Sequence, residues 1–263
     1  MLPISFMMKL SFDTSLAAGY KSRSQIARVL TEAWFDEEMY CPACTSDYLD
    51  RLPDNTKVKD FYCPDCQETY QLKAKSTPFG RRVANSEYHT KVDKIRKGLS
   101  PNWSFLRYDI TDHRVVDLMI VPKHFMTLDA VEKRKPLSDD ARRSGWVGSN
   151  ILLDRLPPDA HLYVVKEGEI VPKRAVRREW KRFEFLGTMD IYARGWLNDV
   201  LMCMRELGKE VFTLRELYEY EEKLKELYPN NKHVKAKIRQ QMQALRDAGV
   251  VEFVDGQGMY QVV

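Results

Sequence analysis

Two closely spaced cysteine pairs limit the folds open to this chain more than any other feature. Cys41 and Cys44 form one Cys-x-x-Cys unit, Cys63 and Cys66 form a second, and eighteen residues separate them. Two such units bring four thiolates around one ion, which suits tetrahedral zinc and leaves no open coordination position. We therefore predict a structural zinc knuckle over residues 41–66. A redox role is the weaker alternative, because two units at this spacing seldom arise by chance.

The composition is that of a folded protein. Of the 263 residues, 44% are hydrophobic and 30% are charged, with Lys+Arg (42) nearly balancing Asp+Glu (38). This supports one large domain or two ordinary ones and argues against wholesale disorder. The first residues lack a basic leader, and no run approaches the roughly 20 apolar residues of a membrane span. We expect a soluble, cytoplasmic protein with no membrane association, where cysteines serve as metal ligands.

Basic residues gather in two stretches although the net charge is only +4. Residues 173–182 hold six basic side chains and one acid, and residues 230–246 hold five basic side chains and no acid. Local basic stretches in a nearly neutral chain suggest a surface for a polyanion. Solvated helix faces are the alternative for each stretch taken alone.

A second chemistry overlaps the second cysteine pair. Asp60 precedes one predicted strand, and Gln71 and Lys73 lie two apart on the next. Residues two apart share a face of a strand, so both can face one pocket with Asp60, while Leu72 points away. Metal-dependent nucleases use an acid and a second oxygen ligand on Mg²⁺ and a lysine near the attacking water. The pattern alone is weak, because a turn acid and a solvated lysine produce it too.

The order of predicted elements divides the chain near Gly187. Residues 1–186 alternate between helices and strands, which predicts an α/β domain with a mixed sheet. In this part we expect a first helix that Ser22 or Ser24 can cap and that carries apolar residues at helical spacing from Ile26 to Trp34. We also expect helices over 87–97 and 173–186, strands over 61–62, 69–74, 103–108, 115–121 and 162–165, and loops over 77–85 and 125–150.

Residues 187–263 follow the order of a winged helix. We expect helices over 196–207 and 213–228, a third helix over 232–247 capped by Asn231, and strands over 250–254 and 259–262 joined by the turn DGQG. Thr213 and Glu216 match a capping box.

The third helix of this domain has the pattern of a recognition helix. At 100° per residue one sector holds Lys232, Lys235, Arg239, Gln243 and Arg246, beside a separate apolar stripe. One side can pack on the domain while the other contacts DNA. The preceding helix is rich in glutamate and should face away from DNA. A protein-interaction role is the alternative, since winged helices serve that purpose too.

The chain also resembles a known family, the DpnI-like methyl-directed (type IIM) restriction endonucleases related to the Dam-replacing proteins. The resemblance rests on YKSRSQIARVLTEAW (20–34), YCPAC (40–44), DFYCPDC (60–66), YQLKAKS (70–76), FLRY (105–108), VPKHF (121–125), RKPLSDDARRSGWVGSNI (134–151), ARGW (193–196) and NKHVKAKIRQQMQALRDAGVVEF (231–253). It implies a PD-(D/E)xK nuclease domain with a zinc knuckle, a C-terminal winged helix, and Mg²⁺-dependent cutting of double-stranded DNA at adenine-methylated GATC sites, largely as a monomer. It also implies that Asp60 and Lys73 are catalytic.

One position departs from the family pattern. Its central acid is a glutamate, and this chain has Gln71, which keeps an oxygen ligand but drops one negative charge. Mg²⁺ should then bind more weakly. The alternatives are a variant that still cuts, an introduced Glu→Gln change, a reader that binds methylated DNA without cutting, and a zinc and winged-helix transcription regulator.

The segment 142–148 is a candidate for reading the methyl group. Trp146 lies between Arg142–Arg143 and Gly148 in a predicted basic loop. An apolar contact with a methyl group is worth on the order of 1 kcal/mol, so an aromatic side chain here can favour methylated DNA. The resemblance places a tryptophan of this segment near the methyl group. Arg142 and Arg143 can bind phosphates or guanine edges. A packing role for Trp146 is the alternative.

Overall fold

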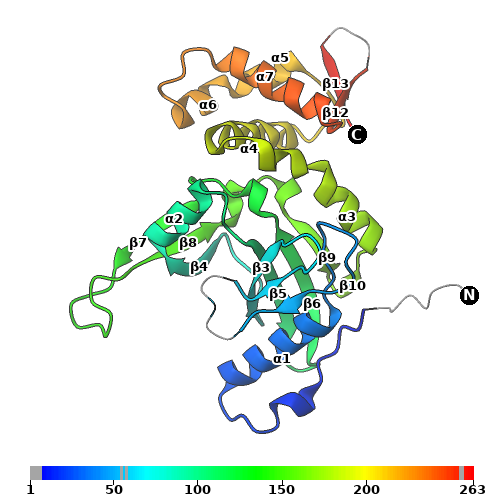
Figure 1. Ribbon diagram of the computed structural model, residues 1–263. Helices are drawn as coiled ribbons and strands as arrows, with labels where there is room; N and C mark the ends of the chain where they lie inside the picture. Colours follow the sequence, from blue (N-terminus) through cyan, green and yellow to red (C-terminus); the bar gives the residue numbers. More distant parts are fainter. Residues whose placement is uncertain (1–7, 54–55, 57–58, 255–257) are drawn as a thin grey trace, which may run out of the picture.

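The computed structural model describes residues 8–53, 56, 59–254 and 258–263, so most of the predicted DGQG turn lies outside the described residues. The protein has a mixed α/β part and a smaller, mostly helical C-terminal part stacked on it (Figure 1). Among the described helices, none has the length and apolar character that crossing a membrane would require.

The main sheet organises the α/β part. Its described strands lie in the order β1 (Asp50–Arg51), β2 (Phe61–Tyr62), β3 (Thr69–Lys75), β5 (Asn102–Asp109), β6 (Arg114–Val121), β9 (Leu162–Lys166) and β10 (Glu169–Ile170). The central pair β3 and β5 is parallel and the other neighbours are antiparallel, so the sheet is mixed, as predicted.

The two faces of this sheet pack against different elements. Helices α1 (Arg23–Glu38) and α3 (Lys173–Arg182) cover one face, where Phe35 is buried. Tyr70 of β3 is buried in the same cluster, and Leu72 packs against it. Because side chains alternate on a strand, the residues next to these two point to the opposite face.

The opposite face carries a second apolar cluster. It is built from Trp103, Phe105, Met119 and Val121 of β5 and β6. Helix α2 (Tyr88–Arg96) contributes to the same cluster, together with residues of a smaller sheet. The candidate site on β3 lies beside this cluster, because Gln71 and Lys73 pair in register with Trp103 and Phe105.

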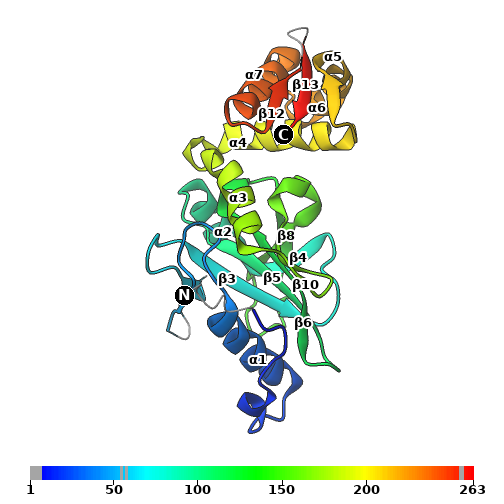
Figure 2. The same ribbon diagram turned by 90° about the vertical axis from the view of Figure 1, so that its right-hand side faces the viewer.

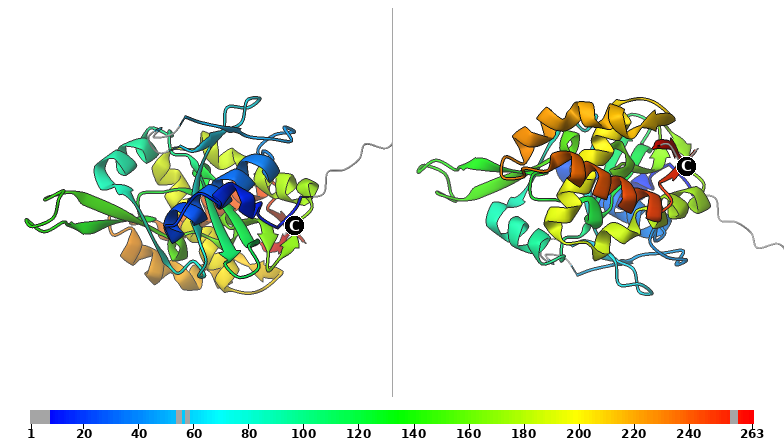
Figure 3. Two further views of the ribbon diagram at one scale, coloured as in Figure 1. Left: turned by 90° about the horizontal axis from the view of Figure 1, so that it is seen from below. Right: turned by 90° about the horizontal axis from the view of Figure 1, so that it is seen from above.

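The smaller sheet corrects two of the sequence predictions. Its described strands are β4 (Arg82–Glu87), β8 (Val147–Leu152) and β7 (Val131–Pro136), paired antiparallel in that order. The predictions of loops over 77–85 and 125–150 were therefore wrong in part. These strands carry charged residues and few apolar ones, because only part of each strand packs on the core. The β7–β8 hairpin projects from the body (Figures 1 and 3).

The C-terminal part contains helices packed with a small antiparallel sheet, the arrangement of a winged helix. The described elements are α4 (Ile191–Glu206), α5 (Leu214–Leu217), α6 (Glu221–Leu227), α7 (Val234–Asp247), β11 (Val211–Thr213), β12 (Val251–Phe253) and β13 (Met259–Val262). A short 3₁₀ helix, η6 (Tyr218–Tyr220), joins α5 to α6. The described 3₁₀ helices before α4 are η1 (Thr14–Ala17), η2 (Lys123–Phe125), η3 (Leu153–Arg155), η4 (Pro158–Ala160) and η5 (Glu184–Thr188).

Local hydrogen bonds set the ends of these helices. The predicted capping box is confirmed, with Thr213 and Glu216 each bonding the other's backbone. The predicted cap at Asn231 was wrong, because its side chain accepts from His233 N at 2.8 Å in the turn before α7, and His233 is the N-cap residue. Helix α4 begins earlier than predicted, because the Asp190 carboxylate accepts from two backbone N–H groups of its first turn.

Helix α4 joins the two parts of the molecule and lies between them (Figure 2). One buried apolar cluster contains Phe125 and Phe183 as well as Leu197 and Leu201 of α4. The amide of Asn198 donates to the carbonyl of Phe125 at 2.8 Å. The division into 1–186 and 187–263 stays a prediction, since one core runs across it.

The buried carboxyl group of Asp199 on α4 leads to a prediction about how the stability of the protein depends on pH. The Tyr228 hydroxyl donates to Asp199 Oδ2 at 2.5 Å. Burial raises the pKa of Asp199 from 3.8 to about 6, against the lowering effect of this hydrogen bond. The folded state therefore keeps a proton that the unfolded chain loses, so this group's contribution to stability falls as the pH rises from about 4 to about 6.

We predict that Asp199→Asn raises the free energy of unfolding at pH 7 by about 2 kcal/mol and changes it little at pH 4. Urea denaturation across this pH range measures the difference. Asp190→Asn at the exposed start of the same helix is the control, because the pKa of Asp190 is lowered. If the free energy of unfolding of Asp199→Asn falls between pH 4 and pH 6 as it does for the wild type, Asp199 is not the group responsible for this pH dependence.

Candidate functional site

The four paired cysteines come together in the folded chain. Their sulfur atoms all lie within 4.8 Å of one another. Cys41 Sγ is 3.6 Å from Cys66 Sγ, and Cys44 Sγ is 3.5 Å from Cys63 Sγ. This donor set fits tetrahedral zinc, as the spacing predicted, while the fifth cysteine is buried on α4.

The knuckle is attached directly to the strands of the candidate active site. Cys63 follows β2, and its N–H donates to the carbonyl of Glu68 at 2.8 Å, which turns the chain toward β3. Cys41 Sγ lies 3.2 Å from the hydroxyl of Tyr70 on β3. Zinc bound here would therefore hold both β2 and β3.

Asp60 is fixed against the middle of β3 by two hydrogen bonds. Its N–H donates to the carbonyl of Tyr70 at 2.9 Å. Its Oδ2 accepts from the N–H of Leu72 at 2.8 Å. The carboxylate is thereby held at the level of Leu72, between the positions of Gln71 and Lys73 on the strand.

The charges of Asp60 and Lys73 act on each other. Burial raises the pKa of Asp60, and the Lys73 ammonium partly opposes this rise. Burial also lowers the pKa of Lys73, and the Asp60 carboxylate partly opposes that fall. The structure thus brings these two predicted residues together in a partly desolvated place.

Gln71 lies two residues before Lys73 on β3, so its side chain points to the same face of the strand. Its Oε1 is buried and has no hydrogen-bond partner among the residues that the structure describes. A carboxylate and an amide oxygen are the hard donors that Mg²⁺ prefers. Asp60 and Gln71 therefore fit a divalent cation, although with one negative charge fewer than a site with two acids.

Sequence reasoning missed one residue of this neighbourhood, Lys91 on α2. Its side chain is 2% exposed, and its Nζ lies 3.3 Å from the centroid of the Trp103 ring. Burial lowers the pKa of Lys91 to about 6, and the charge of Lys73 adds to this effect. The available signal was helical spacing, because Lys91 lies three residues after Tyr88 and four before Ile95, on the apolar face of the helix.

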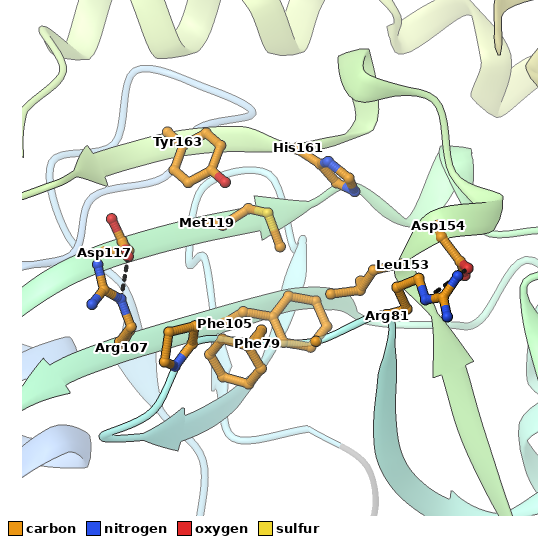
Figure 4. A pocket seen from close by; sticks show the side chains of 12 residues that line it. Phe79, Arg81, Phe105, Arg107, Asp117, Met119, Leu153, Asp154, His161 and Tyr163 are labelled. Atoms are coloured by element: carbon orange, nitrogen blue, oxygen red, sulfur yellow. Dashed lines mark hydrogen bonds and ion pairs between the residues drawn. The ribbon is translucent and has the colours of Figure 1, made fainter.

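An aromatic cavity of about 450 Å³ opens on the same face of the sheet. Figure 4 shows Phe79, Phe105, Met119 and Tyr163 around it, with an Arg107–Asp117 ion pair at one end. Phe105 pairs in register with Lys73 across β3 and β5, so the cavity begins next to the candidate site.

The structure places the predicted methyl-reading residues in the loop between β7 and β8. Arg142 and Arg143 are exposed, and the Arg143 guanidinium lies 5.8 Å from the centroid of the Trp146 ring. The ring rests on Gly148, where a Cβ atom would come within 2.7 Å of it. Trp146 is thus packed in place at the base of an exposed loop in which Asp139 and Asp140 balance the charge of the two arginines.

Helix α7 carries most of the predicted recognition residues. Lys235, Arg239 and Gln243 are exposed and Arg246 is partly exposed, while Lys232 is exposed just before the helix. The opposite side is buried through Val234, Ile238, Met242 and Leu245. The helix therefore has the two-sided character that the sequence predicted.

The glutamate-rich segment before α7 touches this basic face. Lys235 Nζ lies 3.2 Å from Glu221 Oε2, and Arg239 donates to the Tyr218 hydroxyl at 3.1 Å. The expectation that the acidic segment faces away from DNA stays a prediction, although one of its glutamates pairs with Lys235. An ion pair at that position reduces the positive charge available to a polyanion.

Comparison with protein families gives two matches that span most of the chain. The Dam-replacing family, DpnI, matches residues 8–189, and the Dam-replacing HTH domain matches residues 192–262. The protein belongs to the Dam-replacing family. Membership confirms the resemblance found in the sequence and implies a restriction-type nuclease with a DNA-binding helix-turn-helix domain at its C-terminus.

The cysteine cluster leads to a prediction about metal content. Cys63→Ser removes one thiolate, so zinc per chain should fall from about one to near zero, and the Tm by roughly 10 °C, because a bound structural metal contributes to folding. Elemental analysis and thermal unfolding measure the two effects. Cys203→Ser, outside the cluster, is the control and should retain zinc. Full zinc content in Cys63→Ser would contradict a four-cysteine site.

Proposed function

We propose that this protein is a type II, methylation-dependent restriction endonuclease with a PD-(D/E)xK-type site. Its proposed reaction is Mg²⁺-dependent hydrolysis of double-stranded DNA at GATC sites that carry 6-methyladenine. The observation that carries the proposal is the placement of Asp60 against β3, between Gln71 and Lys73. Membership in the Dam-replacing family supports the reaction class.

The side chains of the site would divide the chemistry as follows. Asp60 and Gln71 would hold Mg²⁺, and the chemistry that this ion supplies is stabilisation of negative charge on the phosphate. Lys73 lies next to Asp60, and its lowered pKa makes the amine suited to orient or deprotonate the attacking water.

Hydrolysis forms a bond from the water oxygen to phosphorus and breaks the bond from phosphorus to the 3′ oxygen. The water proton leaves toward Lys73 or solvent, and the 3′ oxygen takes up a proton. The products are a 5′-phosphate and a 3′-hydroxyl, without a covalent enzyme intermediate.

Methyl recognition is proposed for two surfaces. In the first, Trp146 offers an aromatic face while Arg142 and Arg143 contact DNA. In the second, Lys232, Lys235, Arg239, Gln243 and Arg246 of α7 and its N-terminal turn face the major groove. Burying one methyl group gives only a modest preference for methylated over unmethylated DNA, so two surfaces that each contact a methyl group would increase that preference. The protein is proposed to act as a monomer.

A cleavage assay tests this function directly. Purified protein and Mg²⁺ are incubated with a GATC plasmid prepared with and without adenine methylation. We expect cleavage of the methylated plasmid only. Equal cleavage of both contradicts methyl specificity. Tight binding of methylated DNA without cleavage favours the non-cleaving reader, which the neutral amide at Gln71 makes the main rival.

Substitution of Lys73 distinguishes the proposed nuclease from a transcription regulator without catalytic activity. We predict that Lys73→Met lowers the cleavage rate at least about 100-fold and leaves the affinity for methylated DNA nearly unchanged, because the side chain acts on water. Lys75→Met, two residues further on the same face of β3, is the matched control and should cut normally. A transcription regulator would lose no function in either variant.

The neutral amide at Gln71 leads to a prediction about how cleavage depends on the Mg²⁺ concentration. Gln71→Glu restores a second carboxylate, so the Mg²⁺ concentration for half-maximal cleavage should fall about tenfold. Gln71→Ala removes the oxygen and should raise that concentration. Titrating cleavage with Mg²⁺ compares the three proteins. The same Mg²⁺ dependence in all three would exclude position 71 as a metal ligand.

A further inference from the structure

Lys91 approaches the candidate site from the opposite side to Asp60. Its helix, α2, packs on the face of the sheet that carries Gln71, Lys73 and Trp103. Trp103 pairs in register with Gln71 across β3 and β5, and the Lys91 ammonium lies over the Trp103 ring. Lys91 therefore reaches the same small area of the sheet as the predicted metal ligand.

The position of Lys91 is unfavourable for the free protein. Its Nζ is fully buried, and within the described chain it has no hydrogen-bond partner. The Trp103 ring compensates only in part, because the contact of a cation with an aromatic ring gains less free energy than the burial of an unpaired ammonium costs. A methionine would fill the same space between Ile95 and Trp103 without that cost.

The charges around Lys91 favour an anion. After burial itself, the charges that act most on its titration belong to two other cations, Lys73 and Lys94. The position that pairs with Trp103 holds a neutral amide, Gln71, and the carboxylate of the site, Asp60, acts on Lys73. Two lysines and one acid give this centre a net positive charge when both amines are protonated, and the anion that the proposed function brings here is a DNA phosphate.

We propose that Lys91 is a fourth side chain of the candidate active site and binds the phosphate group that is to be cleaved. The ammonium, held over Trp103, would stabilise the charge that develops on the phosphate oxygens. This rests on the proposed nuclease function in one respect, namely that the phosphate at this place is the one cut. No bond to Lys91 forms or breaks.

The test compares full-length Lys91→Met with Lys97→Met, an exposed lysine at the end of the same helix that pairs with Asp93. Three quantities are measured: the Tm, the Kd for methylated GATC duplex in Ca²⁺ as a function of salt, and the cleavage rate in Mg²⁺. Lys91→Arg keeps the cation and tests for rescue of DNA affinity.

We expect Lys91→Met to have a higher Tm than the wild type, because it removes a buried amine without a partner in the described structure. Its cleavage rate should fall about 100-fold, its Kd should rise several-fold, and its salt slope should decrease by about one, because one phosphate contact is lost. Lys97→Met should match the wild type in Kd, salt slope and rate.

Wild-type cleavage and DNA affinity in Lys91→Met would overturn the proposal and leave the nuclease function standing. A lower Tm with losses that follow the unfolded fraction would also overturn it, since the lysine would then only support the fold. Failure of the wild type to cut would reject the nuclease function alone. In that case the Kd and salt slope of Lys91→Met still decide whether Lys91 binds phosphate.

Discussion

The candidate site depends on one hydrogen bond, from the N–H of Leu72 to the carboxylate of Asp60. β2 is two residues long, and its ladder with β3 pairs Phe61 with Tyr70 and Tyr62 with Thr69, so it can hold Asp60 in place only if its own ends are held. The cysteine cluster holds the far end, directly after Tyr62. The cysteine cluster and the candidate site are therefore one mechanical unit, in which zinc bound by the four cysteines would set the position of a carboxylate proposed for catalysis.

Because side chains alternate along β3, one face of the strand packs in the apolar core and the other carries the candidate site residues. Tyr70 and Leu72 join the apolar cluster beneath α1, while Gln71 and Lys73 face the side of Trp103 and α2. Polar groups at a core border cost free energy wherever they lack partners, and the described structure shows this cost at Gln71 and Lys91. Local conflict with good packing is expected where a fold keeps a functional site.

The sequence predicts a structural feature well when the interactions that determine it join residues close together in the chain, and poorly when they join residues far apart. Cysteine spacing and the two-residue period of β3 are local, and they were sufficient to predict the cysteine cluster and to put Lys73 within reach of the charge of Asp60. Strands β4, β7 and β8 were missed because their partners lie far along the chain and their residues are mostly charged or small. Lys91 was missed for a related reason: a lysine is ordinarily solvent-exposed, and only the packing of α2 on Trp103 buries this one.

Gln71 and Lys91 change the electrostatics of the site in the same direction. An amide in place of an acid removes a negative charge, so on its own the protein attracts Mg²⁺ more weakly, and the buried lysine would add a positive charge once a phosphate beside it favours its protonated form. Mg²⁺ is commonly held by one or two carboxylates together with substrate phosphates. On the proposed function, DNA would then supply part of the metal site, and the ion would bind well only once a phosphate is in place. Cleavage would depend on prior recognition of DNA, which suits an enzyme that must choose its sites before it cuts.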